Sequence, residues 1–350
     1  MDLMLSSDQE AIQASVRSFL ENELPMARVR EVAQAGPDAL DAVWRAAGEL
    51  GFFGLAIPEA HGGAGYAITE EMVLLEEIGR ALAPGPWLGC VLAARTLAGA
   101  GGQAHSDLAR IVAGELRTAL VDATSPASSI VVRGNEVSGE SGYVTDADAS
   151  TALLVVAPHA IVYVAPGSGA EIESRPSLDP TRRIARIRFP GTRGALLADD
   201  TAAVGALLRT ATALACAEAV GGIQRTVEMS VEYGKVRRQF DKPIGSFQAV
   251  KHRCADMAVR AEVARSATTY AVVSVRDAAP DQDFQVSVAK ILCGGAYVQN
   301  AADNVQNHGG MGFTWECDAH LFVKRARSFD VALGSRLEQL DRLAGGFRAA

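Results

Sequence analysis

The stretch RRQFDKPIGSFQAVKHRCADM, residues 237–257, joins two long segments that both have helical periodicity. Pro243 and Gly245 predict a sharp turn between them, because proline ends a helix and glycine tolerates a tight turn. Arginine side chains bind phosphate oxygens, and the N-terminus of the following helix adds partial positive charge. We therefore expect an anion-binding turn here, with a solvated basic loop as the simpler alternative. The basic residues at the turn are Lys235, Arg237, Arg238, Lys242 and Lys251.

A second stretch, QNHGGMGFTWE at residues 306–316, interrupts helical sequence with three glycines. Glycine in a helical region lowers stability unless the backbone turns sharply or another group must approach the main chain closely. We expect a close approach at Gly309 and Gly310. An anion or a flat ligand would suit both stretches.

Composition limits the classes of function that fit the chain. The 350 residues carry a formal net charge of −8, which argues against nucleic acid as a partner. The five cysteines have no CxxC spacing, so we expect reduced thiols and no metal site. Neither a signal peptide nor an uninterrupted apolar run long enough to span a membrane is evident, so we expect a cytoplasmic protein. There is also no strand–GxGxxG–helix unit and no P-loop.

The hydrophobic period changes twice along the chain. Residues 1–115 have a helical pattern that begins with SSDQEAIQASVRSFLENEL, where a serine is the predicted N-cap. Residues 116–198 alternate with period two and carry hairpin signals at Gly134–Asn135 and Pro158–His159, which predicts a small antiparallel β domain. Residues 199–350 return to long helices. The helices expected there are Ala202–Tyr233, Gly245–Arg276, Asp281–His308 and Asp318–Ala344.

The two quoted stretches, in this order within the last domain, resemble the signature regions of the flavin-dependent acyl-CoA dehydrogenase family. LGFFGLAIPEAHGGAG at 50–65 and SGYVTDADAS at 141–150 fall where that family would place them, so the resemblance covers nearly the whole chain. It implies an α+β multidomain fold: an N-terminal helical domain, a middle antiparallel β-barrel domain and a C-terminal four-helix bundle. It also implies FAD at the domain junction, in a dimer or dimer of dimers that shares each flavin site.

The resemblance assigns cofactor roles to six residues. Arg237 and Phe240 match residues that reach the FAD of a neighbouring subunit, at the pyrophosphate and the adenosine side respectively. Gln306 and Gly310 match residues whose polar and backbone groups meet the same diphosphate, which would explain the glycines. The remaining two, which match residues lining the isoalloxazine ring, are Tyr143 and Thr145.

The implied reaction is α,β-dehydrogenation of an acyl-CoA thioester, in which a carboxylate removes the α-proton. The two positions at which the family carries this base fall on Leu333 and Ala211, and neither side chain accepts a proton. Asp330 would share a helical face with Leu333, and Glu218 would share one with Ala211. For Asp330 the alternative is a surface or capping carboxylate, and for Glu218 a buried structural hydrogen bond.

The middle domain departs from the family as well. Where the family usually has a threonine–glutamate–proline run with further glycine and serine, this chain has the shortened VDATSPASS, residues 121–129. The flavin half of the site is therefore better kept than the half that covers the thioester.

Three functions remain open from the sequence. The chain is an acyl-CoA dehydrogenase of fatty-acid or steroid side-chain β-oxidation with an unrecognised base, or a base-lacking partner subunit of a heteromeric dehydrogenase, as in some actinobacterial members of the family. A flavin-free scaffold is the third. The expected partners are an acyl-CoA, an electron-transferring flavoprotein or similar acceptor, and a homodimer, homotetramer or heterotetramer with a second chain of the same family.

Overall fold

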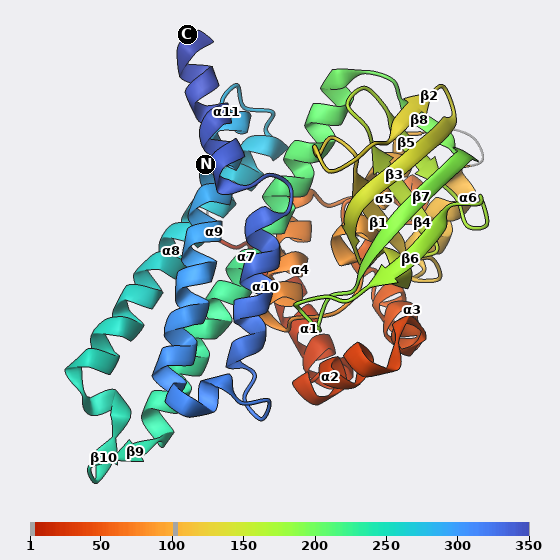
Figure 1. The fold of residues 1–350 in the computed structure, drawn as a ribbon. Helices are drawn as coiled ribbons and strands as arrows, with labels where there is room; N and C mark the ends of the chain where they lie inside the picture. Colours follow the sequence, from red (N-terminus) through yellow and green to blue (C-terminus); the bar gives the residue numbers. More distant parts are fainter. Residues whose placement is uncertain (1–3, 101–103, 350) are drawn as a thin grey trace.

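The computed structural model describes residues 4–100 and 104–349, and Figure 1 shows a helical bundle and a β domain joined by the first-domain helices and by the long helix α7 (Thr201–Val236). Helix α1 begins after Ser6, whose hydroxyl accepts a hydrogen bond from the Gln9 backbone N–H at 3.2 Å, which confirms a serine N-cap. The first domain consists of α1 (Ser7–Glu23), α2 (Met26–Ala35), η1 (Pro37–Leu40), α3 (Asp41–Glu49), η2 (Phe52–Gly54), η3 (Glu59–His61), α4 (Ile68–Arg80), α5 (Trp87–Ala98) and α6 (Ala104–Val112).

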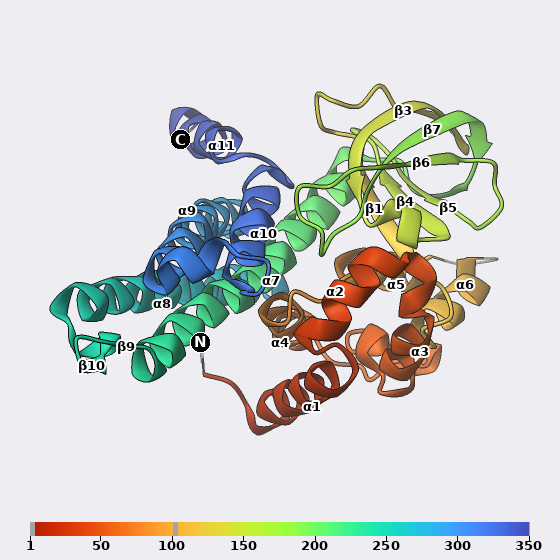
Figure 2. The same cartoon turned by 60° about the horizontal axis from the view of Figure 1, so that its bottom comes forward.

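The middle domain is two four-stranded sheets, ordered β1-β4-β5-β8 and β2-β3-β7-β6. Both predicted hairpins are confirmed, since Gly134–Asn135 joins β2 to β3 and Pro158–His159 joins β4 to β5. Figure 2 shows this domain above α2, α3 and α5. The strands are β1 (Thr118–Asp122), β2 (Val131–Arg133), β3 (Glu136–Thr145), β4 (Ala152–Val156), β5 (Ile161–Val164), β6 (Glu171–Arg175), β7 (Ile184–Arg193) and β8 (Ala195–Ala198).

Two details of the predicted β domain need correction. The two sheets do not close into one barrel, and β1 pairs with β4 in parallel. The chain leaves β1, forms β2 and β3 in the other sheet, and returns to β4 in the same direction, so no hairpin links this pair. All other strand pairs in the two sheets are antiparallel, as expected.

In the C-terminal domain, α7 packs against α4 of the first domain and against α8 and α9 of the bundle. The crossing of α4 and α7 depends on glycine, because a Cβ at Gly79 would lie 1.7 Å from the backbone oxygen of Glu218. The elements of this domain after α7 are β9 (Arg238–Gln239), β10 (Lys242–Pro243), η5 (Ile244–Ser246), α8 (Gln248–Arg276), α9 (Gln282–His308), η6 (Gly309–Phe313), α10 (Ala319–Val331) and α11 (Arg336–Ala349).

The last helix predicted from the sequence, Asp318–Ala344, is two helices. α10 ends at Val331 and α11 begins at Arg336. Leu333 and Gly334 between them have φ angles of 54° and 96°, so the backbone is left-handed and a right-handed helix cannot continue. The first three predicted bundle helices agree with α7, α8 and α9 to within a few residues.

Helix α7 is also the one described helix whose length and apolar composition would allow it to cross a membrane, with a window of mean hydropathy 1.4. In this fold 56% of that window is buried, against α4, α8 and α9. Its apolar composition thus accompanies a central position in the packing.

Candidate functional site

A cavity of about 460 Å³ lies where the three domains meet. Its wall comes from the end of α4, the start of α5, the loop after β1, strand β3, and helices α7, α9 and α10. The loop after β1 is the shortened VDATSPASS stretch, of which Thr124, Ser125 and Pro126 line the cavity. All three domains therefore contribute to one site.

Tyr143 and Thr145 lie at this cavity, at the C-terminal end of strand β3. They are two residues apart and so share one face of the strand, while Val144 between them is buried in the sheet core. The Tyr143 ring is 78% exposed. An exposed aromatic ring and a hydroxyl on one face of a rigid strand suit a flat, hydrogen-bonding ligand.

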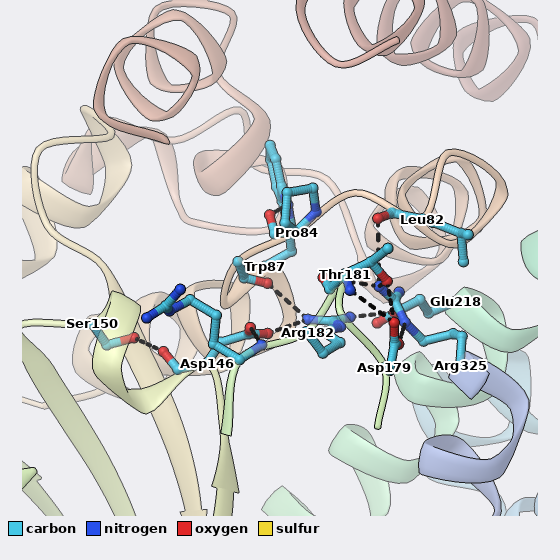
Figure 3. Close-up of polar contacts among 12 residues, drawn as sticks. Leu82, Pro84, Trp87, Asp146, Ser150, Asp179, Thr181, Arg182, Glu218 and Arg325 are labelled. Atoms are coloured by element: carbon cyan, nitrogen blue, oxygen red, sulfur yellow. Dashed lines mark hydrogen bonds and ion pairs between the residues drawn. The ribbon is translucent and has the colours of Figure 1, made fainter. Parts of the chain in front are cut away.

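Two arginines line the cavity and tie the domains together (Figure 3). The Arg182 guanidinium donates to the backbone oxygen of Gly85 at 2.8 Å and to the carboxylate of Asp146 at 2.5 Å, and it also pairs with Glu218. Gly85 belongs to the first domain, Asp146 to the β domain and Glu218 to α7. Arg182 therefore connects all three domains.

Arg325 on α10 is the second arginine of this network. Its guanidinium donates to Asp179 at 2.7 Å, to Glu218 at 3.0 Å and to the Thr181 hydroxyl at 2.7 Å. Its side chain is only 5% exposed. Sequence reasoning missed both arginines, because their partners lie up to 243 residues away along the chain.

The network and its burial shift the pKa values of two carboxylates in opposite directions. Burial alone would raise the pKa of Glu218, but Arg182 and Arg325 outweigh it and hold the pKa below the usual range of a glutamate. Burial raises the pKa of Asp146, against the opposing effect of Arg182. Glu218 is held in two ion pairs, and a carboxylate with a lowered pKa is a weak proton acceptor.

The two positions expected for a base differ in their relation to the cavity. Leu333 lines it, next to Gly334. Ala211 is fully buried and is absent from the described cavity wall, where α7 instead presents Leu208, Thr212 and Ala215. At the expected base position that does line the cavity, the side chain is thus apolar.

Asp330 is likewise absent from the described cavity wall. The expectation that it shares a helical face with Leu333 is wrong, because α10 ends at Val331 and Leu333 has left-handed backbone. Asp330 points elsewhere: its Oδ1 would lie 2.9 Å from a Cβ added at Gly294 of α9.

The cavity wall contains two further carboxylates that the sequence reasoning missed, Asp122 and Glu338. Asp122 accepts hydrogen bonds from the Thr124 backbone N–H and hydroxyl at 3.0 and 2.6 Å. Glu338 accepts from the Ser335 backbone N–H and hydroxyl at 2.6 and 2.8 Å, which is the S-x-x-E capping pattern readable in the sequence. Both carboxylates serve local turns.

The other four predicted cofactor residues, Arg237, Phe240, Gln306 and Gly310, lie at the far end of the bundle, and all four are exposed. Phe240 is 85% exposed at the tip of the β9–β10 hairpin, with a φ of 51° that is rare for a bulky residue. A Cβ added at Gly310 would meet no atom within 4 Å. This group is called the distal group below.

Two contacts bring the ends of the signature stretches together there. The ring of Tyr233 at the end of α7 stacks on His308 at the end of α9, with centroids 4.3 Å apart. Arg253 on α8 donates to the Asn307 side chain at 2.9 Å. The six predicted residues therefore form two groups in one chain, with Tyr143 and Thr145 at the cavity and the distal group well away from it (Figure 1).

A second cavity, of about 850 Å³, lies between α7, the start of α9 and α11. It shares Leu208, Thr212 and Arg342 with the first, so the two adjoin. Its wall includes the Arg209–Asp283 ion pair, at 2.7 Å. Charged side chains therefore line both cavities.

Comparison with known proteins agrees with this arrangement. The acyl-CoA dehydrogenase N-terminal domain model matches residues 6–115, and the C-terminal domain model matches residues 201–346. The chain is 32% identical to the acyl-CoA dehydrogenase IpdE2 of Mycobacterium tuberculosis over 337 residues, which is 96% of both chains. It is 34% identical to FadE34 of the same organism over 353 residues, which is 97% of this chain and 47% of FadE34.

Solved structures resemble the chain over its full length. A variant of the steroid ACAD Tcur3481–Tcur3483 superposes with a TM-score of 0.89 and 25% identity, covering 98% of this chain and 99% of the other. The ChsE4–ChsE5 complex from Mycobacterium tuberculosis gives a TM-score of 0.85 and 25% identity, with both chains fully covered. The matched domains at both ends and the full-length similarity to IpdE2 show that this chain belongs to the acyl-CoA dehydrogenase family.

Proposed function

We propose that this chain is one subunit of an FAD-dependent acyl-CoA dehydrogenase and that a second, homologous chain supplies the carboxylate that removes the α-proton. One observation carries the proposal. Leu333 occupies the cavity position at which the family resemblance places the base, and the carboxylates of the described cavity wall are held by other groups.

The acid–base chemistry argues against the candidates within the chain. A general base works best when its pKa lies near the working pH. Arg182 and Arg325 hold the pKa of Glu218 low, so this carboxylate is a poor proton acceptor. Asp146 is engaged by Arg182 and by the Arg183 backbone N–H at 3.1 Å, and Asp330 is outside the described cavity wall.

FAD is the cofactor of this family, and the residues present fit its parts. Tyr143 and Thr145 offer a ring face and a hydroxyl beside the cavity. In the distal group, Arg237 offers charge for a diphosphate, and Gly310 leaves its backbone open to close approach. When bound, FAD supplies the acceptor for the hydride that leaves the β-carbon of the acyl group.

The separation of the two groups supports an assembly of more than one chain. Tyr143 lies on β3 beside the cavity where the domains meet, whereas Arg237 follows the end of α7 next to β9, at the far end of the bundle (Figure 1), so we infer that a flavin at Tyr143 takes its diphosphate contacts from another chain. In this proposal Arg237 would neutralise the diphosphate of the partner's flavin, Gln306 and the Gly310 backbone would bind the same diphosphate, and Phe240 would pack on the adenosine side.

The comparisons are compatible with a pair of unlike chains. Two of the similar structures carry paired names, Tcur3481–Tcur3483 and ChsE4–ChsE5. FadE34 is about twice as long as the segment that this chain matches, which leaves room for a second unit of the same size. We expect electrons to leave the flavin through an electron-transferring flavoprotein or a similar acceptor.

A self-sufficient dehydrogenase is the second candidate, and the observation in its favour is the open cavity in this chain itself. One experiment separates the two. The chain is purified alone and its flavin absorbance is recorded before and after anaerobic addition of a panel of acyl-CoAs. The same series is repeated after co-expression with the homologous chain encoded nearest to it.

Flavin bleaching only in the co-expressed sample is the expected result. Bleaching by the chain alone contradicts the proposal and identifies a complete site with an unfamiliar base. Flavin in neither sample favours the third function, a scaffold without flavin.

A further inference from the structure

Where α9 packs against α7, the cavity wall contains a tyrosine hydroxyl that has no hydrogen-bond partner among the described residues. Tyr297 of α9 lines the cavity, its side chain is 1% exposed, and its oxygen is buried. The hydroxyl lies against Gly222 of α7, since a Cβ there would be 2.1 Å from the tyrosine oxygen. A buried polar group destabilises the fold unless something bonds to it, so a ligand is a natural partner.

A free carboxylate oxygen lies one helical turn away. Glu218 precedes Gly222 by four residues, so both are on the same face of α7. Arg182 and Arg325 both donate to Oε1 of Glu218, whereas no described residue donates to Oε2. Glu218 also lines the cavity, and its side chain is 13% exposed.

The two groups together select a hydroxyl. An ionised carboxylate only accepts hydrogen bonds, and a tyrosine hydroxyl both donates and accepts. A ligand hydroxyl can donate to Oε2 of Glu218 and accept from Tyr297 at the same time. A ketone satisfies Tyr297 alone.

A ligand carboxylate is disfavoured by the charge of the network. Arg182 and Arg325 are already paired with Asp146, Asp179 and Glu218, so the network has no cation left over for a ligand carboxylate. Much of the remaining wall is apolar, including Leu88, Leu120, Leu208, Ala215, Phe329 and Leu333.

We propose that this cavity binds an apolar acyl group that carries a hydroxyl, and that Glu218 and Tyr297 recognise this hydroxyl. The acyl group enters as its CoA thioester, and this choice of carrier is the one part that rests on the proposed function. The inference concerns binding in this chain, so it does not depend on which chain supplies the base.

Binding to the flavin-loaded protein, co-expressed with its partner where flavin requires it, tests the inference. Anaerobic calorimetry compares 3-cyclohexylpropanoyl-CoA with its 3-hydroxycyclohexyl and 4-hydroxycyclohexyl analogues. We expect at least one hydroxylated thioester to bind about tenfold or more tightly than the parent, because a hydrogen bond to a charged group is stronger than one between neutral groups.

Tyr297→Phe removes only the unpartnered hydroxyl, so the apo protein should unfold at the same or a higher temperature. The variant should reduce the preference to about threefold or less and leave the affinity for the parent thioester unchanged. Tyr163→Phe is the matched control. Its hydroxyl bonds to Asp107 at 3.2 Å and Tyr163 is absent from the described cavity wall, so the preference should not change.

Equal affinity for all three thioesters, no binding of any, or an undiminished preference in Tyr297→Phe would each overturn the inference. The proposed function is read separately from flavin bleaching. Preferential binding without bleaching contradicts the function alone, and bleaching without preference contradicts the inference alone.

Discussion

Arg325 at the domain junction and Arg237 at the far end of the bundle illustrate two different uses of the same side chain. Arg325 is almost fully buried, and each of its three guanidinium nitrogens donates to a partner within the chain. Arg237 is exposed, and its guanidinium has no partner among the described residues. The arginine whose guanidinium is hydrogen-bonded within the chain contributes to folding, whereas the arginine without such partners is available to another molecule. The following predictions test that distinction.

The largest effect is expected from Arg325→Met. Removing this cation leaves Asp179 and Glu218 buried with too few donors, and breaking a buried ion pair on one side typically lowers stability by about 3–5 kcal/mol. Urea denaturation measures the free energy of unfolding. Arg237→Met is the control, and as a surface change it should shift this free energy by less than about 0.5 kcal/mol. Equal losses in the two variants would erase the distinction.

Arg237→Ala should have its effect on the cofactor instead. We expect FAD affinity of the assembled protein to fall by at least about tenfold, because a charge-assisted contact with the diphosphate is lost, while stability is unchanged. Equilibrium dialysis with flavin fluorescence measures the affinity. The control is Arg238→Ala, the adjacent exposed arginine, whose guanidinium bonds to the Asp241 backbone oxygen at 2.5 Å. A similar loss of FAD affinity in both variants would contradict a specific contact of Arg237 and would indicate general attraction between the basic turn and the FAD phosphates.

The interior also contains a carboxylate, Glu76, whose ionised form is disfavoured by burial. Glu76 of α4 is 3% exposed, and burial raises its pKa to about 7. Between the ordinary glutamate pKa and about 7, folded Glu76 holds a proton that the unfolded chain has released, so stability falls as pH rises through this window. Glu76→Gln should therefore raise the free energy of unfolding at pH 8 by roughly 1–3 kcal/mol and change it little at pH 4.

Denaturation at several pH values checks this prediction. A smaller slope should remain in the variant, because burial also raises the pKa of Glu71 to about 7. The neighbouring Glu77→Gln is the matched control with the opposite sign, since Glu77 accepts two hydrogen bonds from Arg17 at 2.6 and 2.9 Å. A variant at Glu76 that is less stable at pH 8 would refute the argument.

The smallest effects are expected from the candidate bases. Asp330→Asn should leave turnover unchanged, and Glu218→Gln should lower it by no more than about tenfold, through weaker binding, if the base comes from a second chain. Stopped-flow bleaching per flavin measures the rate in the co-expressed protein. A loss of more than about a hundredfold from either change would identify that residue as the base.

Local patterns allowed much of the fold to be predicted from the sequence. The hairpins at Gly134–Asn135 and Pro158–His159 follow from alternation and turn residues within a few positions, and three bundle helices follow from their period. Closure of the β domain depends on pairing between distant strands, such as β1 with β4, and no local signal reports it. The break at Leu333 was missed although Gly334 signals a helix end and the S-x-x-E pattern from Ser335 signals a new helix start.

The site divides in the same way. The family motifs named Tyr143 and Thr145, which lie at the cavity, and the distal group, which lies elsewhere. Their cofactor roles remain predictions. Arg182 and Arg325 belong to no local motif, because their partners come from separate domains. Tyr297 belongs to none either, and its hydroxyl has no hydrogen-bond partner among the described residues.

The left-handed backbone at Leu333 has an evolutionary consequence. Leucine and glutamate are both unbranched at Cβ, so each tolerates a φ of 54° at a similar cost of about 1–2 kcal/mol, and the cavity edge exposes part of either side chain. An exchange between them would therefore leave the fold almost unaffected. Under the proposed function, a subunit with the base and a subunit without it could therefore differ at this one position with little effect on folding.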